Sequence, residues 1–269
     1  MSQLRSVFPI VDLAHGWLRE SRGIAFCVTT LPLVHDKERH KAKTGESMSK
    51  RALRLLVMLC ALGTGVPAQA DILVMGDSLL AVNGLQGKSV AKELRRLLPG
   101  EHVRDRSKMG ASYLYPLPVT GAMGMSIPKQ YRQGNWDWVV LNGGGNDVLW
   151  NCGCGPCTRF LDKLITRDGM AGAIADQVRA LRASGARVVF VGYLRSNGFD
   201  SPVDKCGPTG DEMDRRIGRL AKADPGVEFV PLADLVPEGD TSFYAPDRIH
   251  PSPKGSAAIA ARIAKVIAP

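Results

Sequence analysis

The chain is poor in histidine, and it contains no internal repeat, no low-complexity tract and no apolar run long enough to cross a membrane. It has 5 histidines in 269 residues, and only His102 and His250 lie beyond residue 70. Histidine is the side chain that most often acts as a general base near neutral pH, so candidates for that role are few. The other absences exclude a solenoid and argue against a membrane-spanning helix in residues 71–269.

Charge is present in excess of one sign, with a formal net charge of +9. Residues 1–70 hold 10 Lys and Arg against 5 Asp and Glu, whereas residues 71–269 hold 25 against 21. Much of the basic excess therefore lies outside the expected folded domain and argues little for a nucleic-acid partner. The hydrophobic content of 45% and charged content of 23% are typical of a globular protein of one or two domains.

A secretion signal is predicted inside the chain, at residues 48–70. Residues 48–54 are basic, residues 55–66 are apolar, and Ala68-Gln69-Ala70 has the small-x-small pattern of a signal-peptidase site. We therefore expect translation to start at Met48 and residues 1–47 to be a non-native or disordered extension. The mature chain would be residues 71–269, a single domain that is exported to the periplasm or secreted, without stable membrane insertion.

Short apolar runs alternate with helical patterns through residues 71–269. Alternation of this kind predicts an α/β fold with a parallel sheet and helices on both faces. The expected strands are residues 72–75, 102–105, 137–141, 187–192 and 227–231, and the expected helices are residues 89–98, 160–183 (one or a pair), 211–223 and 253–267.

The first expected strand leads directly into Gly76-Asp77-Ser78-Leu79. An apolar run closed by glycine is typical of a buried strand that ends in a tight turn. Such a turn can hold a serine hydroxyl at the carboxyl edge of a parallel sheet, where open α/β sheets bind ligands. We interpret Ser78 as a nucleophile; the alternative is that it caps the following helix.

A serine nucleophile needs a base and a group that orients the base. His250 lies three residues after Asp247, just before the last helix, so both side chains can face the same way. The alternative for this pair is a helix-entry turn with a carboxylate cap. His102 lies beside Glu101 and near the start of a strand, where a structural or surface role is expected.

Acyl transfer also requires donors for a developing oxyanion. Candidates are the backbone N–H groups of Ser78 and Gly110 and the side-chain amide of Asn146. These residues follow the first three expected strands, so a parallel sheet brings them to one edge. The alternative for residues 143–146 is an ordinary flexible turn.

Together these four blocks resemble the SGNH (GDSL) hydrolase family, in which they occur in this order. The resemblance rests on Gly76-Asp77-Ser78-Leu79, Gly110, Gly144-Gly145-Asn146-Asp147 and Asp247-x-x-His250, and it covers most of residues 72–267. It implies a flavodoxin-like three-layer α/β/α sandwich with five parallel strands. It also implies Ser78 as nucleophile, His250 as base, Asp247 as its orienter, and Ser78, Gly110 and Asn146 as the oxyanion hole.

The implied reaction is hydrolysis of an oxygen ester through an acyl-enzyme, with no metal or organic cofactor. The substrate would be a small-molecule, glycan or lipid ester. An acyltransferase with the same chemistry and a non-catalytic carbohydrate- or lipid-binding module remain alternatives. Oligomeric state and acyl length stay open.

Four cysteines lie in residues 71–269, at Cys152, Cys154, Cys157 and Cys206. In an exported chain they predict two disulfides with three possible pairings, and a four-cysteine zinc site is the alternative. We expect cross-links to the Cys206 loop to stiffen one rim of the site. Five side chains near the site in sequence could line an acyl or sugar pocket or simply pack: Tyr113, Tyr115, Met123, Met125 and Trp150.

Overall fold

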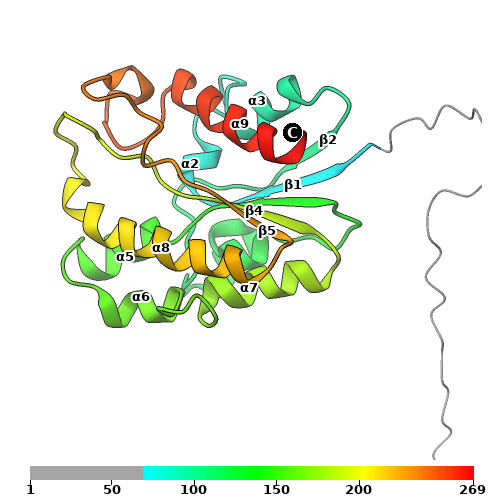
Figure 1. Cartoon of the computed structure of the whole chain (residues 1–269), viewed down its shortest axis with the longest axis horizontal. Coiled ribbons are helices and arrows are strands. Elements are labelled where there is room, and N and C mark those ends of the chain that lie inside the picture. The colour runs from blue at the N-terminus through cyan, green and yellow to red at the C-terminus, as the bar shows by residue number, and fades with distance from the viewer. Residues whose placement is uncertain (1–68) are drawn as a thin grey trace, which may run out of the picture. The chain divides into compact units, whose positions relative to one another are not determined.

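The computed structural model describes residues 69–269 (Figure 1). The expected extension, residues 1–47, and residues 48–68 of the expected signal peptide lie outside the described residues. Within the described part of the chain, no helix combines the length and the apolar character that crossing a membrane requires.

Five parallel strands form one sheet in the order β2-β1-β3-β4-β5. The strands are β1 (Asp71–Met75), β2 (His102–Asp105), β3 (Trp138–Leu141), β4 (Arg187–Val191) and β5 (Val227–Val230). In the central register Leu73 of β1 pairs with Val139 of β3, which in turn pairs with Val188 of β4. This strand order is that of a doubly wound, flavodoxin-like sheet, and it confirms the expected fold class.

Helices cover both faces of this sheet. The longer ones are α3 (Val90–Leu97), α5 (Gly145–Cys152), α6 (Thr158–Leu164), α7 (Ala173–Ala183), α8 (Gly207–Ala223) and α9 (Pro253–Ile267). Shorter turns are α2 (Ser78–Ala81), α4 (Pro118–Thr120), η1 (Gly121–Met125), η2 (Ile127–Gln130), η3 (Asp204–Cys206) and η4 (Thr241–Phe243).

Most of the longer helices lie where the sequence predicted them. Ser89 caps α3 by accepting a hydrogen bond from Lys92, and Ser252 caps α9 in the same way from Gly255. The stretch 160–183 is a pair of helices, and α8 begins at Gly207 rather than at residue 211. Helix α5 was not predicted from the sequence, because it begins in the run Gly143-Gly144-Gly145, which is typical of a loop.

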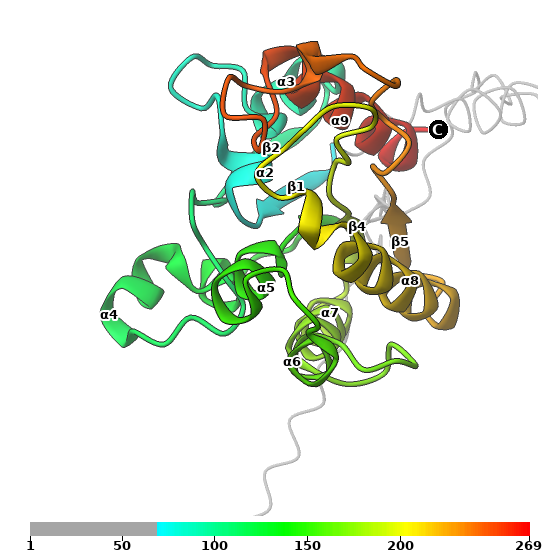
Figure 2. The same cartoon turned by 90° about the vertical axis from the view of Figure 1, so that its left-hand side faces the viewer.

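Alternate side chains of β1, β3 and β4 enter two separate cores, one on each face of the sheet. Figures 1 and 2 show the helices on the two faces. Ile72 and Val74 of β1 pack with α3 and α9 on one face, whereas Leu73 and Met75 pack with α6, α7 and α8 on the other. Since both faces are covered, the central strands are almost continuously apolar, as in β3, where all four residues are buried. The result is three layers, with α2, α3 and α9 above the sheet and α5 to α8 below it in Figure 1.

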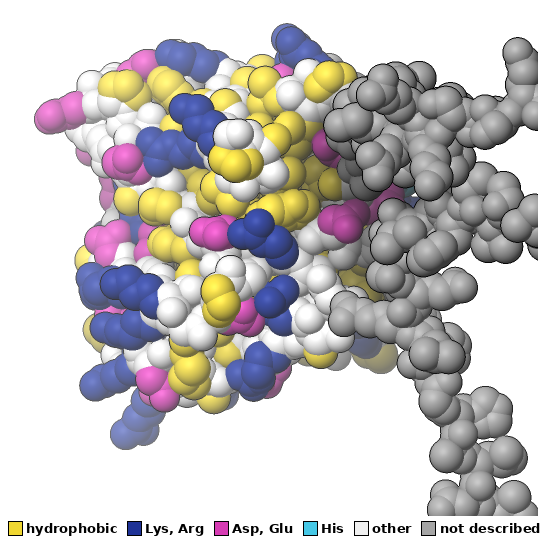
Figure 3. All heavy atoms as spheres, turned by 45° about the vertical axis from the view of Figure 1, so that its right-hand side comes forward, with side chains coloured by type: hydrophobic (Ala, Val, Ile, Leu, Met, Phe, Trp, Pro, Cys, Tyr) yellow, Lys and Arg dark blue, Asp and Glu magenta, His cyan; other side chains and the backbone are white. Residues whose placement is uncertain are grey.

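The outer surface away from the carboxyl edge of the sheet has mixed charge. Lys and Arg side chains and Asp and Glu side chains are interspersed with apolar ones on the face shown in Figure 3. A mixed surface of this kind is the usual state of a folded protein.

Gly76 ends β1 in a position that excludes a side chain. Its φ is +151°, and a Cβ there would lie 2.9 Å from the backbone oxygen of Asn142, which follows β3. The turn after β1 can therefore approach the turn after β3 only because residue 76 is glycine.

We predict that Gly76→Ala lowers the free energy of unfolding by about 1–3 kcal/mol more than Gly87→Ala, because a backbone clash is added to the unfavourable φ. Gly87 is the matched control: its φ is +69°, and a Cβ there meets no atom within 4 Å. Urea unfolding of both variants measures the difference, and equal midpoints would contradict the close approach of the two turns.

Candidate active site

Ser78 lies at the N-terminus of α2, directly after the turn that closes β1. The N-cap of this helix is Asp77, whose Oδ1 accepts a hydrogen bond of 2.9 Å from the N–H of Leu79. The alternative interpretation of Ser78 as a cap is therefore wrong. With Asp77 in that role, the Ser78 side chain is left to line a pocket that also contains Asn146 and His250.

Asp77 itself is fully buried, and its hydrogen bonds connect two turns. Burial raises its pKa to about 6, although hydrogen bonds from Tyr193 and Leu79 oppose the shift. The Tyr193 hydroxyl donates to Asp77 Oδ2 and accepts a 2.9 Å bond from the N–H of Gly145. Tyr193 thus links the turn after β1 to the first residue of α5.

Gln130 holds the same turn from the other side. Its side chain is completely buried; Oε1 accepts from the N–H of Gly76 at 2.7 Å, and Nε2 donates to the carbonyl of Gly76 at 2.9 Å. Nε2 also donates to the carbonyl of Gly124 at 2.8 Å. The amide pairs with Gly76 as a neighbouring strand would, and so fixes the residue that precedes Asp77 and Ser78.

Asp247 and His250 lie in the turn before α9 and form a hydrogen-bonded pair. His250 Nδ1 is 2.7 Å from Asp247 Oδ2, and Asp247 Oδ1 accepts from the backbone N–H groups of Ile249 and His250. Burial tends to raise the pKa of Asp247, but these hydrogen bonds outweigh it and hold the pKa below its usual value. Asp247 therefore stays ionised and fixes the orientation of the imidazole ring.

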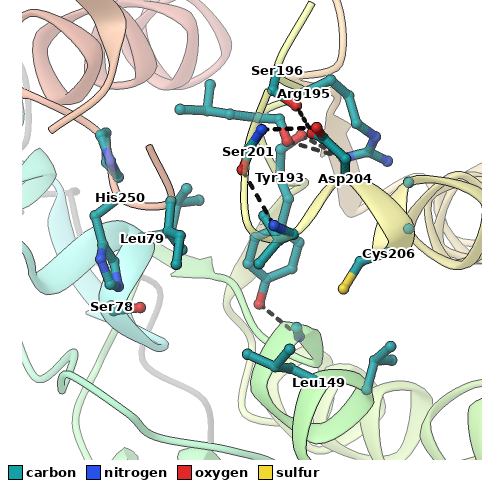
Figure 4. A pocket seen from close by; sticks show the side chains of 18 of the residues that line it. Ser78, Leu79, Leu149, Tyr193, Arg195, Ser196, Ser201, Asp204, Cys206 and His250 are labelled. Carbon is teal, nitrogen blue, oxygen red and sulfur yellow. Dashed lines mark hydrogen bonds between the residues drawn. The ribbon is translucent and has the colours of Figure 1, made fainter. Parts of the chain in front are cut away.

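The other side of the His250 ring faces Ser78. Figure 4 shows the ring next to the Ser78 side chain, at one end of the pocket. The two side chains are not hydrogen-bonded to each other in this structure; such bonds are often long in free enzymes and tighten with substrate. The arrangement can support transfer of a proton from a serine hydroxyl to an oriented imidazole.

The loop after β2 is joined to the start of α5. Asn146 donates from Nδ2 to the carbonyl of Ala111 at 2.9 Å, and the buried Asp147 carboxylate accepts from the N–H groups of Tyr113 and Leu114. Burial raises the pKa of Asp147, and these two backbone bonds oppose the shift. The bonds bring Asn146 beside the loop that contains Gly110.

The expected donors are only partly gathered in the pocket. Ser78 and Asn146 line it together with His250, whereas Gly110 lies in the adjoining loop, outside the lining residues. One hydrogen of the Asn146 amide is used by Ala111, which leaves the other for a ligand.

The pocket has a volume of about 340 Å³ and extends from Ser78 along the segment after β4. Its lining is apolar on the side of α5 and α8, with Val148, Leu149 and Met213, and polar on the side of residues 195–204. A pocket with this division suits a ligand that has an apolar body and a polar end.

Of the two roles left open for the aromatic and methionine side chains near the site, lining a pocket does not apply to this pocket. None of Tyr113, Tyr115, Met123, Met125 and Trp150 is among its lining residues. Tyr113 is part of the core, whereas Met123 and Trp150 are exposed to solvent. The sequence placed them near the site correctly but could not tell which side of the loop they occupy.

The remaining candidates are His102 and the four cysteines of residues 71–269. His102 pairs with Asp71 at the opposite end of β1 and β2 from Ser78. The structure pairs Cys152 with Cys157 and Cys154 with Cys206, and Cys206 lines the pocket. Among residues 69–269, no group of three His, Cys, Asp or Glu side chains is placed to hold a metal ion.

Sequence reasoning missed Tyr193 and Gln130. Tyr193 comes two residues after β4, so the rule that ligands bind at the carboxyl ends of parallel strands could have found it. Nothing in the sequence marks Gln130, because its partner Gly76 is 54 residues away.

The sequence model of the GDSL-like lipase/acylhydrolase family matches residues 74–258. No curated protein matched the chain.

Three of the similar solved structures come from bacteria. A carbohydrate acetylesterase from Sinorhizobium meliloti is 17% identical with a TM-score of 0.51, covering 74% of this chain and 99% of that chain. A GDSL-like lipase from Bacteroides thetaiotaomicron is 18% identical with a TM-score of 0.52, covering 80% and 96%. A protein from Lactobacillus plantarum is 19% identical with a TM-score of 0.54, covering 74% and 96%. At these identities the structures show the fold.

We predict that Gln130→Leu lowers the free energy of unfolding by about 1–3 kcal/mol, because the buried N–H of Gly76 loses its acceptor. Gln130→Glu keeps that acceptor but would bury a carboxylate oxygen against the carbonyls of Gly76 and Gly124, so its loss should be at least as large. Gln133→Leu is the control, since Gln133 is exposed in the same segment. Urea unfolding compares the three; a Gln130→Leu protein as stable as the control would show that the amide does not hold the turn.

Proposed function

Because the chain belongs to the GDSL-like lipase/acylhydrolase family, we propose that it is a serine esterase that cleaves carboxylic esters through Ser78, His250 and Asp247. Membership of the family makes the chain a hydrolase of the esterase and lipase kind. The finer assignment rests on one observation: the imidazole of His250 is bound to Asp247 on one side and lies next to Ser78 on the other.

The proposed reaction has two steps. Ser78 Oγ attacks the ester carbonyl carbon while His250 Nε2 takes the hydroxyl proton, and collapse of the tetrahedral intermediate expels the alcohol, which receives that proton. Water then attacks the acyl-enzyme with His250 again as base, and the acid leaves as Ser78 Oγ regains its proton. Asp247 stabilises the imidazolium that forms in each step.

The developing oxyanion is assigned to the N–H groups of Ser78 and Gly110 and to the free amide hydrogen of Asn146. In support, Asn146 is already bonded to Ala111, the residue after Gly110, so the two donors are held in a fixed relation. Each preorganised donor is typically worth about 10²–10³ in rate.

The substrate we propose is an acylated carbohydrate or a lipid. The mixed lining of the pocket supports an ester with an apolar acyl part and a polar alcohol part. Among the structurally similar proteins, one is a carbohydrate acetylesterase and another is a GDSL-like lipase, and both are ester hydrolases.

We also propose that the chain is exported after cleavage near Ala70 and that the four cysteines of the mature chain are oxidised. The pattern of residues 48–70 supports export. Two cysteine pairs within bonding distance support oxidation, and one of them joins the segment after α5 to the pocket rim at Cys206.

We predict that a fluorophosphonate forms a single adduct on the protein, and that the adduct maps to Ser78. His250→Ala and Ser78→Ala should each lower kcat for a short-chain ester by about 10⁴–10⁶-fold, since the nucleophile or its base is lost. Intact mass and peptide mapping detect the adduct, and a chromogenic ester series gives kcat.

Ser196→Ala is the matched control, because this serine also lines the pocket but lies on the segment after β4. It should keep the adduct. A folded, oxidised protein that forms no adduct and cleaves no ester would contradict the proposal and favour a binding module. Turnover of the ester only when a sugar acceptor is present, with the acyl group transferred to that sugar, would identify an acyltransferase.

A further prediction concerns export and oxidation. Protein recovered from its native host should have a mass that corresponds to a start near Asp71. Its four cysteines should resist alkylation until they are reduced, since disulfides persist outside the cytoplasm. A start well before Asp71, or alkylation of all four thiols without reductant, would contradict the corresponding proposal.

A further inference from the structure

The segment between β2 and β3 has an unusual charge composition. Residues 106–136 contain four basic side chains and neither Asp nor Glu. The basic residues are Arg106, Lys108, Lys129 and Arg132, and three of them are exposed. The pKa of Arg106 is lowered by burial and then by the positive charges of Arg132 and Arg104, so these groups share one region of the surface.

The same segment exposes large apolar side chains. Leu117, Val119 and Met123 are 57%, 73% and 69% exposed, and Met109 and Leu114 are also exposed. Trp150 of α5 is also exposed. Single apolar side chains on a surface need no explanation, but a cluster of this size usually marks an interaction site.

The elements that carry these residues lie against one another, since α4 contacts η1 and η1 contacts η2. A Cβ on Gly110 would lie 3.5 Å from Met125 and 3.8 Å from Trp150, so the loop after β2, η1 and α5 meet there. The side chain of Lys108 lies against Gly124, and the amine of Lys129 lies near Gly121. We call the exposed residues Met109, Leu114, Leu117, Val119, Met123 and Trp150, with these flanking basic residues, the loop surface.

The loop surface adjoins the proposed oxyanion hole. Gly110 lies within it, and Trp150 follows Asn146 by four residues on α5, which places both on one side of that helix. Gln130 ties the same segment to Gly76, two residues before Ser78. In Figure 2, α4 projects beside α5 at the edge of the sheet that carries the pocket.

The positive charge and the exposed apolar side chains of the loop surface together indicate what kind of partner it binds. Apolar side chains flanked by Lys and Arg, without acidic residues, are typical of proteins that lie on anionic membranes. A second copy docked by two-fold symmetry would bring the same four positive charges against each other. The face in Figure 3 carries charges of both signs, so it would not favour an anionic membrane in this way.

We propose that the loop surface docks on an anionic lipid bilayer and presents the active site to esters carried by that bilayer. This inference deepens the proposed function by naming a lipid surface as the source of substrate. Docking itself does not need an active Ser78, so the two proposals can fail separately.

The test is co-sedimentation of the full chain with phosphatidylglycerol vesicles and with phosphatidylcholine vesicles. Leu117→Ser/Val119→Ser/Met123→Ser should lower the affinity for phosphatidylglycerol at least about tenfold, since three apolar side chains are lost. Lys108→Gln/Lys129→Gln should lower the affinity for phosphatidylglycerol vesicles about fivefold for each charge removed. All variants carry the same residues 1–70, so that segment cannot produce a difference between them.

Two control variants have matched chemistry elsewhere on the surface. Leu85→Ser removes a fully exposed leucine from the segment between α2 and α3, and Lys88→Gln/Lys92→Gln removes two exposed lysines. Both should bind as the parent does. Unfolding midpoints and hydrolysis of a soluble short-chain ester should be unchanged in the loop-surface variants, whereas hydrolysis of a bilayer-borne ester should fall with binding.

Ser78→Ala should bind vesicles as tightly as the parent, which separates docking from catalysis. Equal binding to both lipids, or undiminished binding of the triple variant, would overturn the inference. So would a parent dimer in solution that the triple variant converts to monomer, because a second copy would then be the occupant.

Discussion

The common direction of the five strands is the constraint on which the site depends. Because the strands are parallel, their carboxyl ends meet at one edge, and the turns after β1, β2, β3 and β4 are forced together. Ser78, Ala111, Asn146 and Tyr193 come from these four turns. An antiparallel sheet made from the same segments would distribute them over both edges.

Buried polar groups then hold the turns at hydrogen-bonding distance. Asp77 and Asp147 are both buried, which is unfavourable for a carboxylate unless hydrogen bonds compensate. Their partners come from other turns: Tyr193 for Asp77, and the backbone of Tyr113 and Leu114 for Asp147. The carboxylates therefore favour one arrangement of the edge, since other arrangements would leave them unpaired.

The segment between β2 and β3 packs against this edge on one side and is exposed to solvent on the other. Its inner side supplies Gln130 to the turn before Ser78, and its outer side exposes apolar and basic residues. An element that is buried on one side and apolar on the other suits a protein whose substrate lies in a surface rather than in solution. The pocket, by contrast, opens along the segment after β4, where polar side chains predominate.

The sequence by itself determined the strands, the caps at Ser89 and Ser252, and the candidates Ser78, Asn146, Asp247 and His250, because turn chemistry and residue spacing are local properties. It could not determine contacts between distant residues. Tyr193 meets Asp77 across 116 residues, and Gln130 meets Gly76 across 54. The pairing of the cysteines and the exposure of Met123 and Trp150 also followed only from packing. Such contacts depend on how the layers are assembled, and tertiary structure alone decides that.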